Sequence, residues 1–147
     1  NIKKGVRNEQ VSKAINACKK VNLQSTASFI FGSIDETRES IQESIDFSLQ
    51  LDADFVLYNI YTAHPGTSGF DRALREGVIS DFKVDVEKYT GEPVGVPTIC
   101  KNLTREELHM LKAEAYIKYY TQKGAEFYKD IIQTYVDEIE MLKAKTV

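Results

Sequence analysis

Two short apolar runs, residues 25–31 and 55–61, carry no charged side chain and are rich in β-branched and aromatic residues, a composition typical of buried strands. Each run stops at a glycine or at Pro-Gly, and apolar residues then recur at helical spacing. Two strand–turn–helix units in succession predict neighbouring parallel strands. Because ligands bind at the carboxyl ends of parallel strands, we expect any site at the two turns.

Helices are predicted on either side of these strands. Residues 8–21 place apolar side chains at helical spacing, and Asn8 is the expected N-cap. Asp35 is the expected cap of the helix between the strands. A short helix capped by Thr67 or Ser68 should follow the second strand.

The C-terminal half has a different pattern. Residues 80–102 lose periodicity and are interrupted by glycine and proline, which predicts an irregular loop. Thr104 and Glu107 have the spacing of a capping box, and the following helical pattern has a break at Gly124. The chain therefore divides into strand–helix units over 1–79, an irregular loop over 80–102 and a helical tail over 103–147.

Composition and charge limit the kinds of partner that the chain is expected to bind. The net charge is −3 and the 19 basic residues form no block, so we expect no nucleic-acid partner and assign the tail tyrosines to packing. No apolar run is long enough to cross a bilayer, so no membrane partner is expected. Cys18 and Cys100 lie far apart, which predicts reduced thiols in a cytoplasmic protein, with Cys18 a small buried hydrophobe.

Few residues suggest chemistry by themselves. The cysteines and histidines lack the close spacing of a zinc site, and no glycine-rich phosphate loop is present. Helical spacing puts most of the carboxylates of Asp35, Glu36, Glu39 and Glu43 on a solvated face. His64 stands at the end of a predicted strand, where either a backbone-bonded turn residue or a ligand contact is consistent with the sequence.

Four segments, which follow one another in the same order as in the family, resemble the C-terminal half of a radical S-adenosylmethionine (SAM) domain. The subgroup is one that often carries an upstream cobalamin-binding domain. Phe29-Ile-Phe-Gly32 with Glu36-Thr37 is similar to the family's "f-i-x-G-l-P-G-E-T" strand and turn, although Ile34-Asp35 replaces Pro-Gly. Pro65-Gly66-Thr67 matches its "P-x-P-G-T" turn, with Thr62-Ala63 where the first proline is expected. The other two segments are the lead helix, from Lys4-Gly5 through residues 8–17, and the start of the tail, residues 103–120.

The resemblance implies an α/β fold: the C-terminal βα units of a partial (β/α)6 TIM-like barrel with parallel strands, followed by a long helical tail. It implies SAM and a 4Fe–4S cluster in the parent protein, which together generate a 5′-deoxyadenosyl radical, and cobalamin as a further cofactor. The family's C-x-x-x-C-x-x-C cluster motif is missing from this sequence. We therefore expect an inactive C-terminal fragment whose partner is the missing N-terminal half of the same polypeptide.

The resemblance also assigns residues to one wall of the adenine site. These are Ile30, Phe31, Gly32, Tyr61, Thr62, Ala63 and, less directly, His64. No catalytic residue and no metal ligand is assigned. Residues that select the substrate, a small molecule or another group, are expected in the missing part and in residues 80–102.

Two other functions remain open. The chain could be a (β/α) nucleotide- or phosphate-binding fragment without a cluster, or a helical interaction module that uses its tyrosine-rich tail. In a half barrel we further expect an exposed sheet edge and an exposed face, which would favour self-association. The residues expected on that face are Phe29, Phe31, Val56 and Tyr58.

Overall fold

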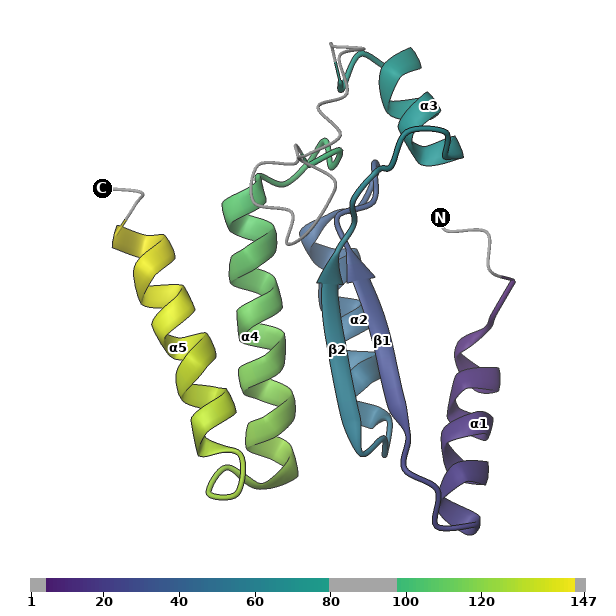
Figure 1. The fold of residues 1–147 in the computed structure, drawn as a ribbon, viewed down its shortest axis with the longest axis vertical. Coiled ribbons are helices and arrows are strands. Elements are labelled where there is room, and N and C mark those ends of the chain that lie inside the picture. The colour runs from purple at the N-terminus through teal and green to yellow at the C-terminus, as the bar shows by residue number, and fades with distance from the viewer. Residues whose placement is uncertain (1–4, 80–97, 145–147) are drawn as a thin grey trace.

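A pair of parallel strands forms the centre of the fold. The structure, a computed structural model, describes residues 5–79 and 98–144. Helices lie on both sides of the strand pair, and the C-terminal helices run next to β2 (Figure 1). In chain order the elements are α1 (Asn8–Lys20), β1 (Thr26–Phe31), α2 (Arg38–Gln50), β2 (Phe55–Ile60), α3 (Ser68–Arg75), α4 (Arg105–Gly124) and α5 (Lys129–Ala144).

The strands are held in register along their whole length. Pairing runs from Thr26 opposite Phe55 to Phe31 opposite Ile60. At the amino ends, the Asp54 carboxylate accepts hydrogen bonds from the Ser25 backbone N–H, at 2.8 Å, and from its hydroxyl, at 3.1 Å. Because the two strands are parallel and paired along their whole length, their carboxyl ends lie side by side.

The described residues do not form part of a barrel. They contain two parallel strands and five helices, so the prediction of a partial (β/α)6 TIM-like barrel is wrong. The position next to β2 is taken by α4 (Figure 1). The Tyr116 hydroxyl of α4 accepts a hydrogen bond from the Tyr58 N–H at 3.0 Å, a role that a further strand would otherwise fill.

The prediction of which face of the sheet is exposed was also wrong. Phe31, Val56 and Tyr58 are at most 2% exposed, because α2 and α4 cover their side of the sheet. Since side chains alternate along a strand, the open face carries the other residues. They are Thr26, Ser28, Ile30, Phe55, Leu57 and Asn59, all of them exposed.

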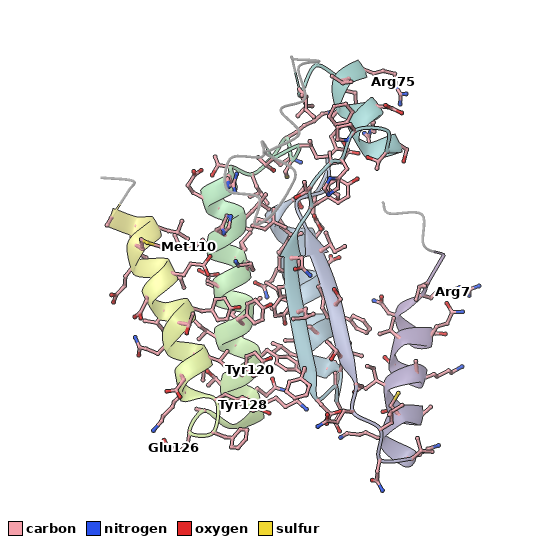
Figure 2. All side chains as sticks on the ribbon, in the orientation of Figure 1. Arg7, Arg75, Met110, Tyr120, Glu126 and Tyr128 are labelled. Carbon is pink, nitrogen blue, oxygen red and sulfur yellow. The ribbon has the colours of Figure 1, made fainter. Side chains whose placement is uncertain are left out.

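Tyrosines of the helical tail build much of the core, which confirms their assignment to packing. Tyr116 packs edge-on against Tyr58, with ring centroids 4.9 Å apart, and stacks on Tyr135 at 4.0 Å. Tyr120 and Tyr128 meet near the turn between α4 and α5, with centroids 4.8 Å apart (Figure 2). The aromatic cluster therefore joins both C-terminal helices to the sheet.

Helix starts follow the sequence at two of four positions. The Thr67 hydroxyl caps α3, and Thr104 with Glu107 forms the capping box of α4, as predicted. Arg7, rather than Asn8, precedes α1, and Thr37, rather than Asp35, caps α2.

The break near Gly124, whose φ is 143°, separates α4 from α5 as predicted. Most of the predicted irregular loop, residues 80–97, lies outside the described residues, as do residues 145–147. Residues 98–102 belong to no helix or strand.

Candidate functional site

The turn after β1 is built around Gly32. Its φ is 94°, a backbone conformation that residues other than glycine rarely adopt. A Cβ at this position would also lie 2.9 Å from the Leu108 Cδ1 atom of α4. The glycine therefore permits both the direction of the turn and the close approach of α4.

The Glu36 side chain closes the same turn. Its carboxylate accepts hydrogen bonds from the backbone N–H groups of Gly32, at 2.5 Å, and Ser33, at 2.9 Å. Charge-assisted bonds of this kind are stronger than neutral ones. Helical spacing did not single out Glu36, yet its side chain holds the end of β1 in shape.

The segment before α4 fastens the turn from outside. Lys101 N–H donates to the Ile34 carbonyl at 3.1 Å, and the Asn102 side-chain amide donates to the Glu36 carbonyl at 3.0 Å. The thiol of Cys100, a buried residue, lies 3.4 Å from the same Glu36 carbonyl oxygen. The first turn therefore depends on residues that lie more than sixty positions later in the sequence.

The end of β2 packs against α3. Ala63 is 2% exposed and belongs to a small apolar cluster. Tyr61 lies over Gly69, where an added Cβ would overlap the tyrosine hydroxyl. The buried members of the cluster are Ile34, Ala63, Phe70, Ala73 and Ile99.

Ion pairs connect α3 to the first turn. The Arg72 guanidinium contacts the carboxylates of Asp35, at 2.6 Å, and Glu76, at 2.5 Å. Lys101 also pairs with Glu76. Hydrogen bonds from Lys101 and Arg72 hold the pKa of Glu76 below its usual range. This surface network keeps α3 next to the first turn.

The seven residues predicted for the adenine wall separate into buried and accessible groups. Phe31, Gly32 and Ala63 are buried. Tyr61 and Thr62 are half-buried, His64 is exposed, and Ile30 is 37% exposed on the open face of the sheet. The accessible residues therefore border the carboxyl end of that face.

The sequence did not draw attention to Asn59. It pairs with Ile30 in the strand register, and its side-chain amide donates to the Ser28 hydroxyl at 3.4 Å. Asn59 is the one polar residue of the β2 strand, Phe55–Ile60, and this interruption of an apolar run is a signal that could have identified it. Ile30 and Asn59 together offer an apolar surface next to an amide.

A three-thiolate iron–sulfur site does not fit the described residues. Within residues 5–79 and 98–144 no three histidine, cysteine or acidic side chains gather as a metal site. Cys18 lies on α1, whereas Cys100 is buried beside the first turn. The cysteines of this chain therefore do not build the cluster that the resemblance implies.

The sequence is similar to part of a longer protein. It is 33% identical over 133 residues to a protein of Pyrococcus horikoshii described as an uncharacterized methyltransferase. The match covers 90% of this chain but 28% of that protein. No protein-family profile matches the chain.

None of the helices in the described part of the chain is both long enough and apolar enough to cross a membrane.

Proposed function

We propose that the chain is the C-terminal portion of a radical SAM enzyme and forms one wall of its adenine pocket. The observation that carries the proposal is the 133-residue similarity to a protein described as a methyltransferase. Many methyltransferases take their methyl group from SAM, and the four ordered segments of this sequence resemble a radical SAM domain. The open carboxyl ends of β1 and β2 offer a place for such a ligand.

The wall consists of Ile30 and Asn59, supported from behind by Phe31. The Ile30 side chain is exposed on the open face, where it can pack against a flat aromatic ring. An asparagine amide can pair with the N6 and N7 edge of adenine through one donor and one acceptor. Because Glu36 and the residues around Cys100 fix the turn, the wall is shaped before a ligand arrives.

The chain alone supplies none of the redox chemistry in this proposal. A 4Fe–4S cluster requires thiolates that Cys18 and Cys100 do not provide, so its ligands would come from another part of the polypeptide. Cobalamin enters only through the resemblance. We expect the isolated chain, reconstituted anaerobically with iron and sulfide, to lack the charge-transfer absorbance of a 4Fe–4S centre. A stoichiometric cluster on the chain would contradict this.

A matched pair of variants in the complete polypeptide tests the wall. Ile30→Asp puts a carboxylate where the ring should pack, and Thr26→Asp puts one on the same face of β1, about 13 Å away at 3.3 Å per residue. We expect equilibrium dialysis to show SAM binding at least about tenfold weaker for Ile30→Asp, a difference of 1.4 kcal/mol. Thr26→Asp should remain within twofold. Equal affinities for both variants would refute the assignment.

The other two functions receive less support. Tyr116 and Tyr120 are 8% and 5% exposed, so these tyrosines offer little surface for a helical interaction module.

A nucleotide- or phosphate-binding fragment without a cluster differs from the proposal in its upstream sequence. Three closely spaced cysteines encoded before residue 1 would favour the radical SAM proposal, and their absence would favour this alternative.

A further inference from the structure

The turn after β1 has two central residues that do not set its shape by themselves. The Glu36 N–H donates to the Ser33 carbonyl at 3.0 Å, so Ile34 and Asp35 occupy the two central positions. Proline at the first of these positions and glycine at the second would restrict the backbone to a turn, whereas isoleucine and aspartate do not. The turn therefore depends on contacts from other residues to keep one backbone conformation.

Asn102, which lies just before α4, provides such contacts through its side chain. Its amide donates to the Glu36 carbonyl at 3.0 Å and to the Asp35 carbonyl at 3.4 Å. A primary amide carries two N–H donors, so it can serve both carbonyls. The neighbouring Lys101 N–H donates to the Ile34 carbonyl at 3.1 Å. Three successive carbonyls of the turn are therefore bonded by two adjacent residues.

Both hydrogen bonds of the Asn102 amide are exposed to solvent. Water can replace the amide without leaving a buried polar group unsatisfied, so the loss of this side chain should leave the folded core intact. The amide gives the two carbonyls a fixed direction, which exchanging water does not. We therefore expect its effect on the shape of the turn and not on folding.

Glu36 connects this amide to the adenine wall. Its carbonyl is bonded by Asn102, and its carboxylate accepts from the Gly32 N–H at 2.5 Å. The residue before Gly32 is Phe31, whose carbonyl accepts from the Tyr61 N–H at 2.6 Å. A displacement of the Glu36 backbone would therefore move the carboxyl ends of both strands, where the adenine wall is proposed.

We infer that Asn102 is a positioning residue of the proposed adenine wall. By holding the Glu36 backbone, it keeps the carboxylate on the Gly32 N–H and the carboxyl end of β1 in the shape that binds SAM. A site that already has its binding shape loses less conformational entropy when the ligand binds, so the amide raises the affinity. The inference rests on the proposed function for the identity of the ligand, whereas the effect of Asn102 on the turn can be measured without one.

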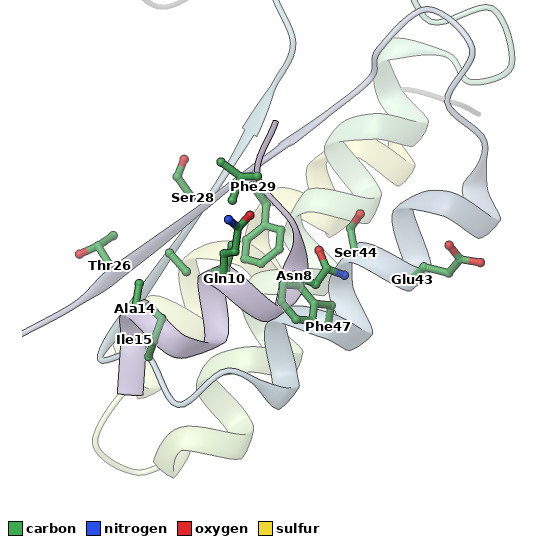
Figure 3. Close-up of a pocket in the computed structure, with 13 residues that line it drawn as sticks. Asn8, Gln10, Ala14, Ile15, Thr26, Ser28, Phe29, Glu43, Ser44 and Phe47 are labelled. Carbon is green, nitrogen blue, oxygen red and sulfur yellow. The ribbon is translucent and has the colours of Figure 1, made fainter. Parts of the chain in front are cut away.

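A groove of about 660 Å³ between α1, β1 and α2 is the alternative place for a ligand, and it supplies a matched control. Figure 3 shows Asn8 among the side chains around this groove. Asn8 is exposed, as Asn102 is, but it lies on α1 and not beside the turn. Asn8→Ala therefore removes the same kind of side chain from a different candidate site.

Equilibrium dialysis of SAM against the complete polypeptide compares the two variants. We expect binding at least about fivefold weaker for Asn102→Ala, and within about twofold of wild type for Asn8→Ala. Unchanged binding by Asn102→Ala would overturn the inference. Equal weakening by both variants would also overturn it, because that result would place the ligand in the groove.

Amide hydrogen exchange in the same polypeptides needs no ligand and so separates this inference from the proposed function. The Gly32 amide should exchange at least about tenfold faster in Asn102→Ala than in wild type or Asn8→Ala. The Tyr58 amide, bonded to Tyr116, should keep its rate in both variants. An unchanged Gly32 amide would overturn the inference, as would equal acceleration of the Tyr58 amide, which would indicate a purely structural role. If the wild type does not bind SAM, the proposed function fails, and the Gly32 amide alone decides whether Asn102 positions the turn.

Discussion

The hydrogen bond between the Tyr58 N–H of β2 and the Tyr116 hydroxyl of α4 predicts a specific effect of removing one oxygen atom. Tyr116→Phe keeps the ring that packs against Tyr58 and Tyr135 but removes the acceptor of the Tyr58 N–H, 3.0 Å away. Tyr58 is 2% exposed, so water cannot readily replace the lost partner. The Tyr116 hydroxyl also hydrogen-bonds the Tyr135 side chain, so the variant separates the hydrogen bonds of this one hydroxyl from the packing of its ring.

The expected loss follows from the cost of a buried, unsatisfied donor. Such a group destabilises a protein by about 1–3 kcal/mol. At about 3 °C per kcal/mol for a chain of this size, the midpoint of thermal unfolding should fall by about 3–9 °C. The slope of the denaturation curve should stay constant, because the surface exposed on unfolding does not change.

Urea denaturation followed by circular dichroism measures the loss, and hydrogen exchange of the Tyr58 amide reports the bond itself. The matched control is Tyr128→Phe, which removes the hydroxyl of a half-buried tyrosine whose ring contacts Tyr120. We expect that control to change the free energy of unfolding by less than about 0.5 kcal/mol. The reasoning is refuted if Tyr116→Phe behaves like the control, or if the Tyr58 amide exchanges at its original rate.

Three further predictions concern the turn and the core. Gly32→Ala should cost about 1–3 kcal/mol in urea denaturation, because it adds a contact with Leu108 to an unfavourable φ; Gly77→Ala, at φ 69° with open space around it, should cost less. Glu36→Gln should destabilise by about 1 kcal/mol, since two charge-assisted bonds become neutral, and an unchanged urea midpoint would contradict this. Burial raises the pKa of Tyr58 to about 12, above its ordinary value of 10.0. Stability should therefore be intact below pH 10 and decline as the pH rises towards 12, by roughly 3 kcal/mol from this group; a flat denaturation profile over that range would refute it.

Local sequence was sufficient for the elements but not for the faces of the sheet. The apolar runs and the Thr104–Glu107 capping box depend on neighbours within a few positions, and the structure has these features where they were predicted. The faces of the sheet carry a weaker signal, because Ile30, Phe55 and Leu57 make the open face partly apolar. The polar residues Thr26, Ser28 and Asn59 all fall on that face, so alternation along the strands favours the buried face that the structure has.

The choice between the faces is made by distant parts of the chain. Tyr116 reaches β2 from 58 positions later, and Leu108 packs against Gly32 from α4. The candidate site shows a related error in assigning residues to a face of the sheet. The resemblance assigned Ile30 and Phe31 together to the wall, although neighbours in a strand point to opposite faces, so of these two only Ile30 reaches the open surface.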